Sequence, residues 1–248
     1  MHIPDGYLSP QTYLPLYGGF AVIAAVAVAK LKRTVDTRLV PYVGMAAAFS
    51  FLIMMFNIPI PGSTTGHAVG GGIIAILFGP WVAFVALSIA LIIQALVFGD
   101  GGITAIGANC FNMGFVMPLV AWYVYRIIAG TNASTRRQMI AVFVAAWLSL
   151  NVAALFTAVE LGIQPLVAAG PDGNPLYAPY PLKITIPAMM GEHLLLFGIV
   201  EGLVSVLIFR YFAQYHPDII AARRKEILDF PCSTGHFNAS GYIFAPMV

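Results

Sequence analysis

Charge is scarce in this chain, and the shortage limits what the chain can be. Only 9% of its 248 residues are charged, with 12 Lys and Arg against 10 Asp and Glu, whereas 60% are hydrophobic and the mean hydropathy is +0.87. A soluble core could not bury so much apolar surface, so composition indicates an integral membrane protein. The small net charge of +2 comes without a basic stripe of interleaved aromatics, so nothing suggests a nucleic-acid partner.

Cysteine is scarce, and the usual catalytic and nucleotide-binding motifs are missing. Cys110 and Cys232 lie far apart without a CxxC spacing, which indicates neither a disulfide framework nor a thiolate metal site. The sequence has no GxxxxGK(S/T) phosphate loop, and no HExxH, GxSxG or paired-carboxylate arrangement. We therefore expect a chain that is not an enzyme and that does not hydrolyse ATP itself.

The hydrophobic runs predict an all-α membrane fold. A membrane-spanning helix needs about 20 apolar residues. Breaks rich in Pro and Gly leave seven segments, at about 12–30, 39–57, 66–78, 80–98, 106–128, 138–160 and 186–210. The third is only about 18 Å long as a helix, so we expect it to be tilted, broken or incomplete. We divide the chain into an integral membrane domain, residues 1–210, and a cytoplasmic C-terminal tail, residues 211–248.

Basic residues set the expected orientation. Eleven of the 12 lie at or after the ends of the first, fifth and seventh segments: Lys30, Lys32, Arg33, Arg38, Arg126, Arg136, Arg137, Arg210, Arg223, Arg224 and Lys225. Only Lys183 falls on the opposite side. The positive-inside rule then predicts an outside N-terminus and a cytoplasmic C-terminus. Residues distant in sequence thereby become neighbours on the outer side: Met1, His2, Asp5, His67, Asp100, Asn109 and Glu192.

The first two residues are candidate metal ligands. No basic, apolar and small-residue leader pattern precedes them, and His2 is too large to follow a cleaved methionine, so we expect Met1 to be retained. The Met1 amine, the His2 amide nitrogen and His2 Nδ1 can close a five-membered and a six-membered ring on one metal ion. These rings supply three nitrogens in one plane. The amide must lose its proton, so binding should strengthen as the pH rises.

His67 is the candidate fourth ligand. Histidine within a membrane segment is expensive and usually functional. With His67 the site would have four nitrogens in a square plane, the geometry of Ni(II) or Cu(II) rather than Zn(II). The alternative is a helix cap, in which Ser63, Thr64 or Thr65 accepts from free N–H groups and His67 only fills a hydrogen-bonded position.

Further polar residues are candidates for holding the ligands in place: Asp100, Asn109, Asn112 and Glu192. Metal-bound histidines usually donate their second ring N–H to such groups. The alternative is that Asp100 is a turn residue and that the asparagines cap or bridge helices. Glu192 could attract cations, but the adjacent His193 cannot easily face the same ion, because neighbouring helical residues diverge. Glu201 lies in mid-span and should have a polar partner.

Three stretches carry a family resemblance: Met1-His2-Ile3-Pro4-Asp5-Gly6, Pro61 to His67 with Gly70-Gly71-Gly72, and Phe98 to Asn109 with Phe111-Asn112-Met113-Gly114. They resemble the substrate-binding (S) components of nickel and cobalt transporters of the energy-coupling factor (ECF) class, the CbiM/NikM family. The resemblance covers all seven segments and implies an S-component fold with an extra N-terminal helix. It implies Met1, His2 and His67 as ligands of Ni²⁺ or Co²⁺, the transported substrate, with no organic cofactor.

The same resemblance implies partners and a location. It implies a transmembrane coupling (T) subunit and two ATPase (A) subunits in an ABC transporter complex, and it allows a small accessory membrane subunit. The location is the plasma (inner) membrane of a prokaryote. Small residues four apart, in Ala21-Ala25-Ala29 and Gly44-Ala48, let helices approach closely and are candidate contact faces, although alanine is common throughout these segments.

Two other functions compete with the S component. An intramembrane metalloenzyme could hold a catalytic ion at His2, His67, Asp100 and Glu192. It would need an open water position and a general base, and a filled plane of four nitrogens offers neither. A transporter driven by an ion gradient and acting alone would predict internal repeats and charges at the midplane, where only Glu201 is evident. Square-planar geometry favours nickel slightly, and the choice between nickel and cobalt stays open.

Overall fold

The computed structural model describes residues 1–34, 40–60, 64–130 and 133–221. Several sequence expectations fall outside these residues: the basic residues Arg38, Arg223, Arg224 and Lys225, the second cysteine Cys232, the segment Pro61 to Ser63, and residues 222–248 of the expected tail.

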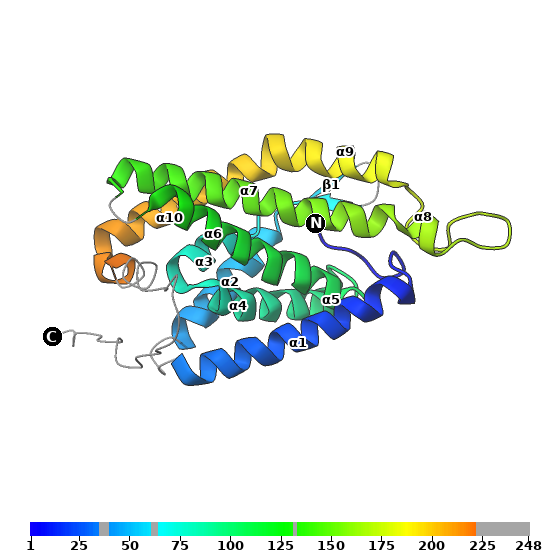
Figure 1. Ribbon diagram of the computed structural model, residues 1–248, viewed down its shortest axis with the longest axis horizontal. Helices are drawn as coiled ribbons and strands as arrows, with labels where there is room; N and C mark the ends of the chain where they lie inside the picture. The colour runs from blue at the N-terminus through cyan, green and yellow to red at the C-terminus, as the bar shows by residue number, and fades with distance from the viewer. Residues whose placement is uncertain (35–39, 61–63, 131–132, 222–248) are drawn as a thin grey trace, which may run out of the picture.

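Helices make up most of the described chain and form one bundle (Figure 1). The elements before the central helix α7 are α1 (Pro10–Thr34), α2 (Val40–Met54), β1 (Ile58–Ile60), β2 (Thr64–Gly66), α3 (Gly71–Phe78), α4 (Pro80–Ile93), η2 (Gln94–Phe98), α5 (Ile106–Asn109), η3 (Cys110–Val116) and α6 (Met117–Ala129). They are followed by α7 (Thr135–Gly162), α8 (Gln164–Val167), α9 (Leu182–Glu192), η4 (His193–Phe197) and α10 (Gly198–Tyr215). The elements marked η are π-helical turns within longer helices.

Five helical stretches of the described residues are long and apolar enough to cross a membrane: 10–32, 80–98, 106–129, 135–167 and 182–215. They correspond to the first, fourth, fifth, sixth and seventh segments expected from the sequence. The second segment is the shorter apolar helix α2, of 15 residues. The mostly helical fold predicted from the hydrophobic runs is therefore confirmed.

The third expected segment differs most from its prediction. Residues 64–66 form strand β2, which pairs antiparallel with β1 so that Ile58 lies opposite Gly66. Helix α3 begins only at Gly71 and is 8 residues long. Thr64 and Thr65 therefore belong to a strand, and no side chain caps the helix N-terminus. The alternative in which one of these threonines caps a helix at His67 is wrong.

Helix α3 is short because it lies inside the bundle. All of its residues are buried, and it packs against α4, α6 and α7. The approach to α7 is close: a Cβ added at Gly72 would lie 3.0 Å from the Cα of Ala146. Glycine and alanine here let two helix backbones come together, as small residues do in membrane bundles. The segment that carries His67 is thus attached to the core of the molecule.

Glu201 of α10 supplies the link between α10 and this segment. Its Oε2 accepts hydrogen bonds from Val69 N at 2.8 Å and from Gly70 N at 2.9 Å, and the side chain is 1% exposed. Gly70 itself has a φ of +76°, which favours glycine. The polar partner expected for Glu201 is therefore the main chain just after His67.

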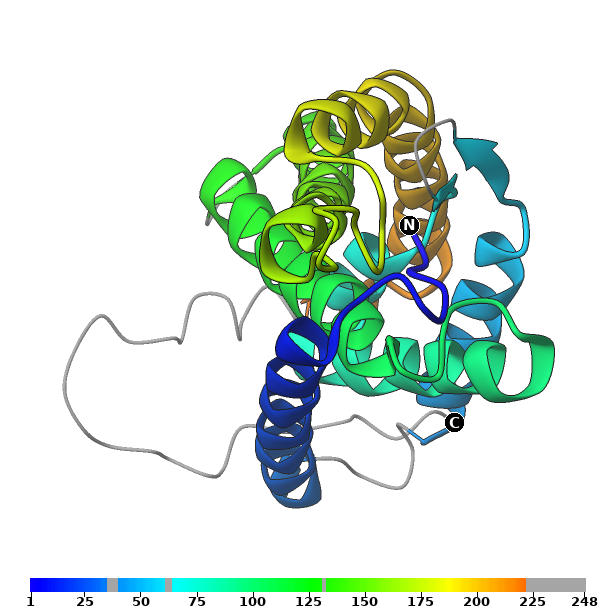
Figure 2. The same ribbon diagram turned by 90° about the vertical axis from the view of Figure 1, so that its right-hand side faces the viewer.

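The segments of interest meet at one end of the bundle. Figure 2 looks onto this end, where the chain begins, and the hairpin of β1 and β2 lies beside it. The loop after η2 joins them, because Gly102 N donates to Ile3 O at 2.8 Å. The long connection between α8 and α9 also reaches this region, where Ala178 N donates to Tyr7 O at 3.1 Å.

We expect Glu201→Ala to destabilise the protein, because it leaves two buried N–H groups without an acceptor, each worth about 1–3 kcal/mol. At about 2–4 °C per kcal/mol for a chain of this size, the midpoint of thermal unfolding should fall by several degrees in detergent. Glu201→Gln retains an acceptor oxygen, so its unfolding midpoint should fall less. Ser205→Ala is the matched control, since Ser205 is also buried on α10 and its Oγ has no hydrogen-bond partner among the described residues. Equal midpoints for Glu201→Ala and the control would contradict this role.

Candidate metal-binding site

The first three residues are buried, and one asparagine holds them. Oδ1 of Asn109 accepts from Ile3 N at 2.9 Å, and its Nδ2 donates to Ile3 O at 3.2 Å. The side-chain amide thus pairs with the backbone of Ile3 as a neighbouring strand would. Exposed fractions are 0% for Met1, 3% for His2 and 0% for Ile3. A chain end, which is usually mobile unless it is tied down, is here a fixed part of the interior.

The next residues of the N-terminal segment are tied to the loop after η2 and to α8. Oδ1 of Asp5 accepts from the backbone N of Thr104 at 2.8 Å and from its hydroxyl at 2.6 Å. Ser9 N donates to Oε1 of Gln164 at 2.9 Å. A Cβ at Gly102 would collide with the backbone and side chain of Asp5, so this approach requires glycine. The segment is anchored along its length as well as at its tip.

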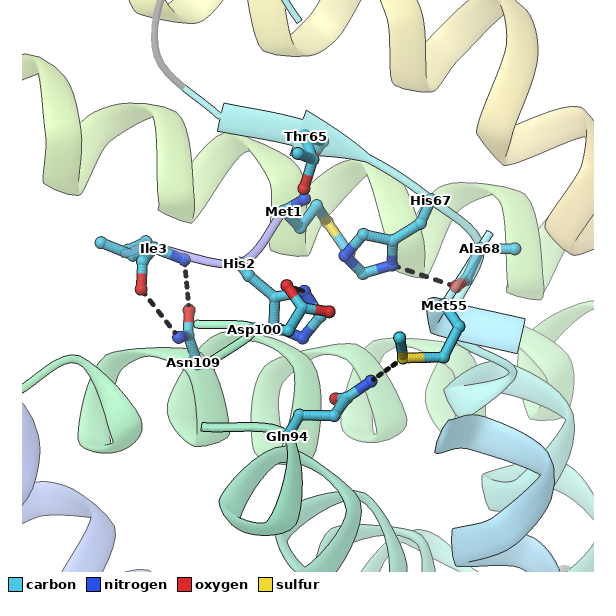
Figure 3. Close-up of polar contacts among 10 residues, drawn as sticks. All are labelled: Met1, His2, Ile3, Met55, Thr65, His67, Ala68, Gln94, Asp100 and Asn109. Carbon is cyan, nitrogen blue, oxygen red and sulfur yellow. Dashed lines mark hydrogen bonds and ion pairs between the residues drawn. The ribbon is translucent and has the colours of Figure 1, made fainter. Parts of the chain in front are cut away.

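His2 and His67 meet although 65 residues separate them in the chain. Their rings are stacked, with centroids 4.6 Å apart and planes inclined by 25° (Figure 3). The Met1 amine lies beside them and donates to the carbonyl oxygen of Thr65. The structure therefore brings together all three residues that the sequence singled out as ligands.

The ring of His67 is oriented by its own backbone. Its Nδ1 lies 3.1 Å from the carbonyl oxygen of Ala68. Because a carbonyl only accepts, this contact places the ring proton on Nδ1 and leaves the lone pair on Nε2. The Nε2 atom is buried and has no hydrogen-bond partner among the described residues. This is the arrangement of a histidine ready to bind a metal ion.

Burial keeps these nitrogens neutral. It lowers the pKa of the Met1 amine to about 4, even though the carboxylates of Asp100 and Glu192 act in the opposite direction. Burial also lowers the pKa of His2 to about 3, and that of His67 well below its usual value. Protons therefore compete little with a metal ion for these lone pairs near neutral pH.

Asp100 lies next to the candidate chelate. Its Oδ1 is 3.4 Å from Nδ1 of His2, the nitrogen that would close the six-membered ring. Burial raises the pKa of this carboxyl, and the nearby amine acts against that shift. Gln94, at the first position of η2, also contacts His2, and its Nε2 lies 3.9 Å from the sulfur of Met55. A cation at His2 would lie beside a carboxylate, which favours its binding.

Of the other residues expected to hold the ligands, two lie at the candidate site and one lies away from it. Asn109 holds the N-terminal segment, as described above. Asn112 points elsewhere: its Nδ2 donates to Oε2 of Glu160 at 2.7 Å and to the hydroxyl of Thr157 at 3.2 Å. Glu192 is half-buried, and its Oε1 lies against Gly66, the residue before His67. Glu192 therefore borders the site, whereas Asn112 belongs to a separate buried network.

Several residues of this region were not found from the sequence. The Thr65 carbonyl, Gln94 and the role of Glu201 depend on packing that no local pattern indicates. Gln94 starts the π-helical turn η2, and such turns frequently mark functional sites. Among the described residues no three His, Cys, Asp or Glu side chains are grouped for a metal ion. The candidate site differs from such a cluster because two of its nitrogens, the Met1 amine and the His2 amide, belong to the main chain.

Comparison with known proteins gives a consistent picture. Residues 2–219 match the CbiM family model, described as the cobalt uptake substrate-specific transmembrane region. The chain is 48% identical over 225 residues to the fused nickel transport protein NikMN of Rhodobacter capsulatus, covering 90% of this chain and 65% of that protein. It is 42% identical to the putative metal transport protein MJ1569 of Methanocaldococcus jannaschii, covering 92% of this chain and 98% of that protein.

Solved structures agree with the sequence relatives. The fold resembles the crystal structure of a truncated transition metal transporter with a TM-score of 0.84 and 45% identity. That match covers 87% of this chain and all of the other. The chain spans about two thirds of the length of the fused relatives, 65% of NikMN and 66% of the probable fused nickel transport protein LarMN of Lactiplantibacillus plantarum. On the family match and these identities, the chain belongs to the CbiM family of nickel and cobalt transport components.

Proposed function

We propose that this chain is the substrate-specific component of an ECF-type ABC transporter and captures Ni²⁺ or Co²⁺ at the outer face of the plasma membrane. One observation carries the proposal: the Met1 amine and His2 are fixed in the interior beside His67, whose Nε2 has no hydrogen-bond partner among the described residues. Three nitrogens from residues 1 and 2 and one from His67 then form the square plane that suits Ni(II).

Charge balance supports a cation at this position. Binding a divalent ion with a deprotonated amide leaves a net charge of about +1 in a buried place, which is costly without a counter-charge. The Asp100 carboxylate lies beside His2, and Glu192 lies against Gly66. Capture requires the Met1 amine to leave the Thr65 carbonyl and the His2 and His67 rings to turn out of their stack. The backbone behind both groups is already held, by Asn109 at Ile3 and by Glu201 at Val69 and Gly70.

The distribution of basic residues supports an outward-facing site. Figure 1 shows α1 and α10 ending at the opposite end of the bundle from the N-terminal segment. Most of the described basic residues lie at the ends of these helices and at the junction of α6 and α7: Lys30, Lys32, Arg126, Arg136, Arg137 and Arg210. Lys183, at the start of α9, is the exception. By the positive-inside rule that end faces the cytoplasm, so the ligands face outward.

Two exposed helix faces are available for the coupling subunit. Ala21, Ala25 and Ala29 are exposed on α1, and Gly44 and Ala48 are exposed on α2. Neither set packs inside the chain, and small side chains let another helix approach closely. These faces fit a membrane partner that links the chain to ATPase subunits, since the chain itself has no phosphate loop.

The N-terminus must be free and in register. Adding one Gly ahead of Met1, or acetylating the amine, should break the three-nitrogen chelate and weaken Ni²⁺ binding strongly while leaving helicity unchanged. Isothermal titration of the purified full chain with Ni²⁺ measures this, and circular dichroism checks the fold. Unchanged affinity in the extended protein would show that the terminal amine is not a ligand.

His67→Ala should remove the fourth nitrogen without disrupting the helices. We expect Ni²⁺ affinity to fall by at least about 10- to 100-fold, the loss that even outer groups of a metal site typically cause. The matched control is His216→Ala, at the far end of α10. If both variants bound Ni²⁺ with the affinity of the unmodified chain, His67 would not be a ligand and its role would be structural.

Transport should need partners. Alone in vesicles the chain should bind Ni²⁺ but not accumulate it against a gradient, and adding coupling and ATPase subunits should give ATP-dependent uptake of radiolabelled nickel. Leu at Ala21, Ala25 and Ala29, or at Gly44 and Ala48, should disrupt assembly at whichever face is used and spare metal binding. Uphill uptake by the chain alone, driven by a proton or sodium gradient, would instead identify a secondary transporter.

A further inference from the structure

A third buried histidine, His193, lies on the helix that packs against the His67 segment. Met189, His193, Phe197 and Glu201 are four residues apart and all buried, so they form one face of the continuous helix from α9 through η4 to α10. Phe197 packs against Gly66, and Glu201 accepts from Val69 and Gly70. This face therefore runs along the chain on both sides of His67.

His193 has the same chemical arrangement as His67. Its Nδ1 lies 2.8 Å from the carbonyl oxygen of Met189, which can only accept, so the ring proton is on Nδ1 and the lone pair on Nε2. The side chain is 0% exposed, and Nε2 has no hydrogen-bond partner among the described residues. A buried polar atom left without a partner is costly, and a functional role is one of the few explanations for it.

His193 also lies close to the metal-binding residues. Its ring is 5.8 Å, centre to centre, from that of Phe197, which in turn packs against Gly66. The adjacent Glu192 places its Oε1 against the same glycine. Adjacent helical residues diverge, and here Glu192 is the half-buried one and His193 the interior one.

We propose that Nε2 of His193 is a further metal ligand, which takes the fourth position when His67 releases the ion. This inference rests on the proposed function, because it assumes the three-nitrogen chelate of Met1 and His2. A metal bound by four nitrogens leaves more easily by ligand exchange than by losing a donor outright, since each new bond forms as an old one breaks. A second imidazole of the same donor type, held in the interior, provides this exchange for a late divalent metal ion such as Ni²⁺ or Cu²⁺.

The test counts imidazole ligands on Cu²⁺, a paramagnetic probe that prefers the same square plane. The full chain and its variants are loaded with one equivalent of Cu²⁺, at a protein concentration high enough for all of the Cu²⁺ to be bound. Electron spin echo envelope modulation (ESEEM) then reports the number of imidazoles coordinated to Cu²⁺. The unmodified chain should show two, from His2 and His67. His67→Ala should bind the ion more weakly, as predicted above, but at this protein concentration it should still show two imidazoles, from His2 and His193. His67→Ala/His193→Ala should show one. The control His67→Ala/His216→Ala should keep two.

The outcomes separate the two proposals. Fewer than two imidazoles in the unmodified chain would contradict the site at Met1, His2 and His67 itself. Two in the unmodified chain with only one in His67→Ala would leave that site standing and overturn the role of His193. His193→Ala alone should keep two imidazoles and an unchanged circular dichroism spectrum. If it lost the metal spectrum while His67 was still present, His193 would be a structural residue and the exchange role would be refuted.

Discussion

The site depends on holding the beginning of the chain inside a membrane bundle. A chain terminus carries an amine that is normally charged and mobile. Burying it favours the neutral amine, and it keeps one position only if the backbone behind it is held. Asn109 does this by pairing its side-chain amide with both backbone groups of Ile3, and Gly102 adds a third hydrogen bond to the same residue. With these contacts the position of residues 1 and 2 follows from that of helix α5, which ends at Asn109, and of the loop before it. Without them the proposed three-nitrogen chelate would have no fixed place.

The second half of the site is fixed by a different helix. Glu201 binds the backbone that leaves His67, and α3 continues that backbone into the core, where Gly72 packs against Ala146. The two histidines are thus attached to two separate parts of the bundle and meet only where these parts come together. This geometry suits a transport component, because a relative shift of the two parts would change the distance between ligands without breaking either anchor. The π-helical turns that start at Gln94 and His193 lie at this junction.

Membership of the CbiM family and the anchored nitrogens are independent observations, and both support the proposed capture of a metal ion. The family match concerns the whole fold, whereas the neutral, buried lone pairs concern the chemistry of particular atoms. An enzyme would need an open coordination position with a base beside it. In the proposed site the nitrogens of Met1, His2 and His67 would instead fill a plane around the ion, which suits the recognition of a transported ion.

The sequence by itself determined the membrane character, the five long helical spans and the three residues that the structure brings together. The length of a hydrophobic run predicts a membrane-spanning helix, because in lipid every backbone polar group must be hydrogen-bonded within the helix. The three candidate ligands could be recognised because the chemistry of Met1, His2 and His67 is local to each residue. The extended course of residues 66–70, the helix α3 that begins only at Gly71, and the partners of Glu201 were decided by the tertiary structure. So was the position of Asn112, whose side chain binds Glu160 rather than the ligand region. These features depend on which helix faces meet, and contacts between residues 48 to 132 positions apart leave no periodic signal in a single sequence.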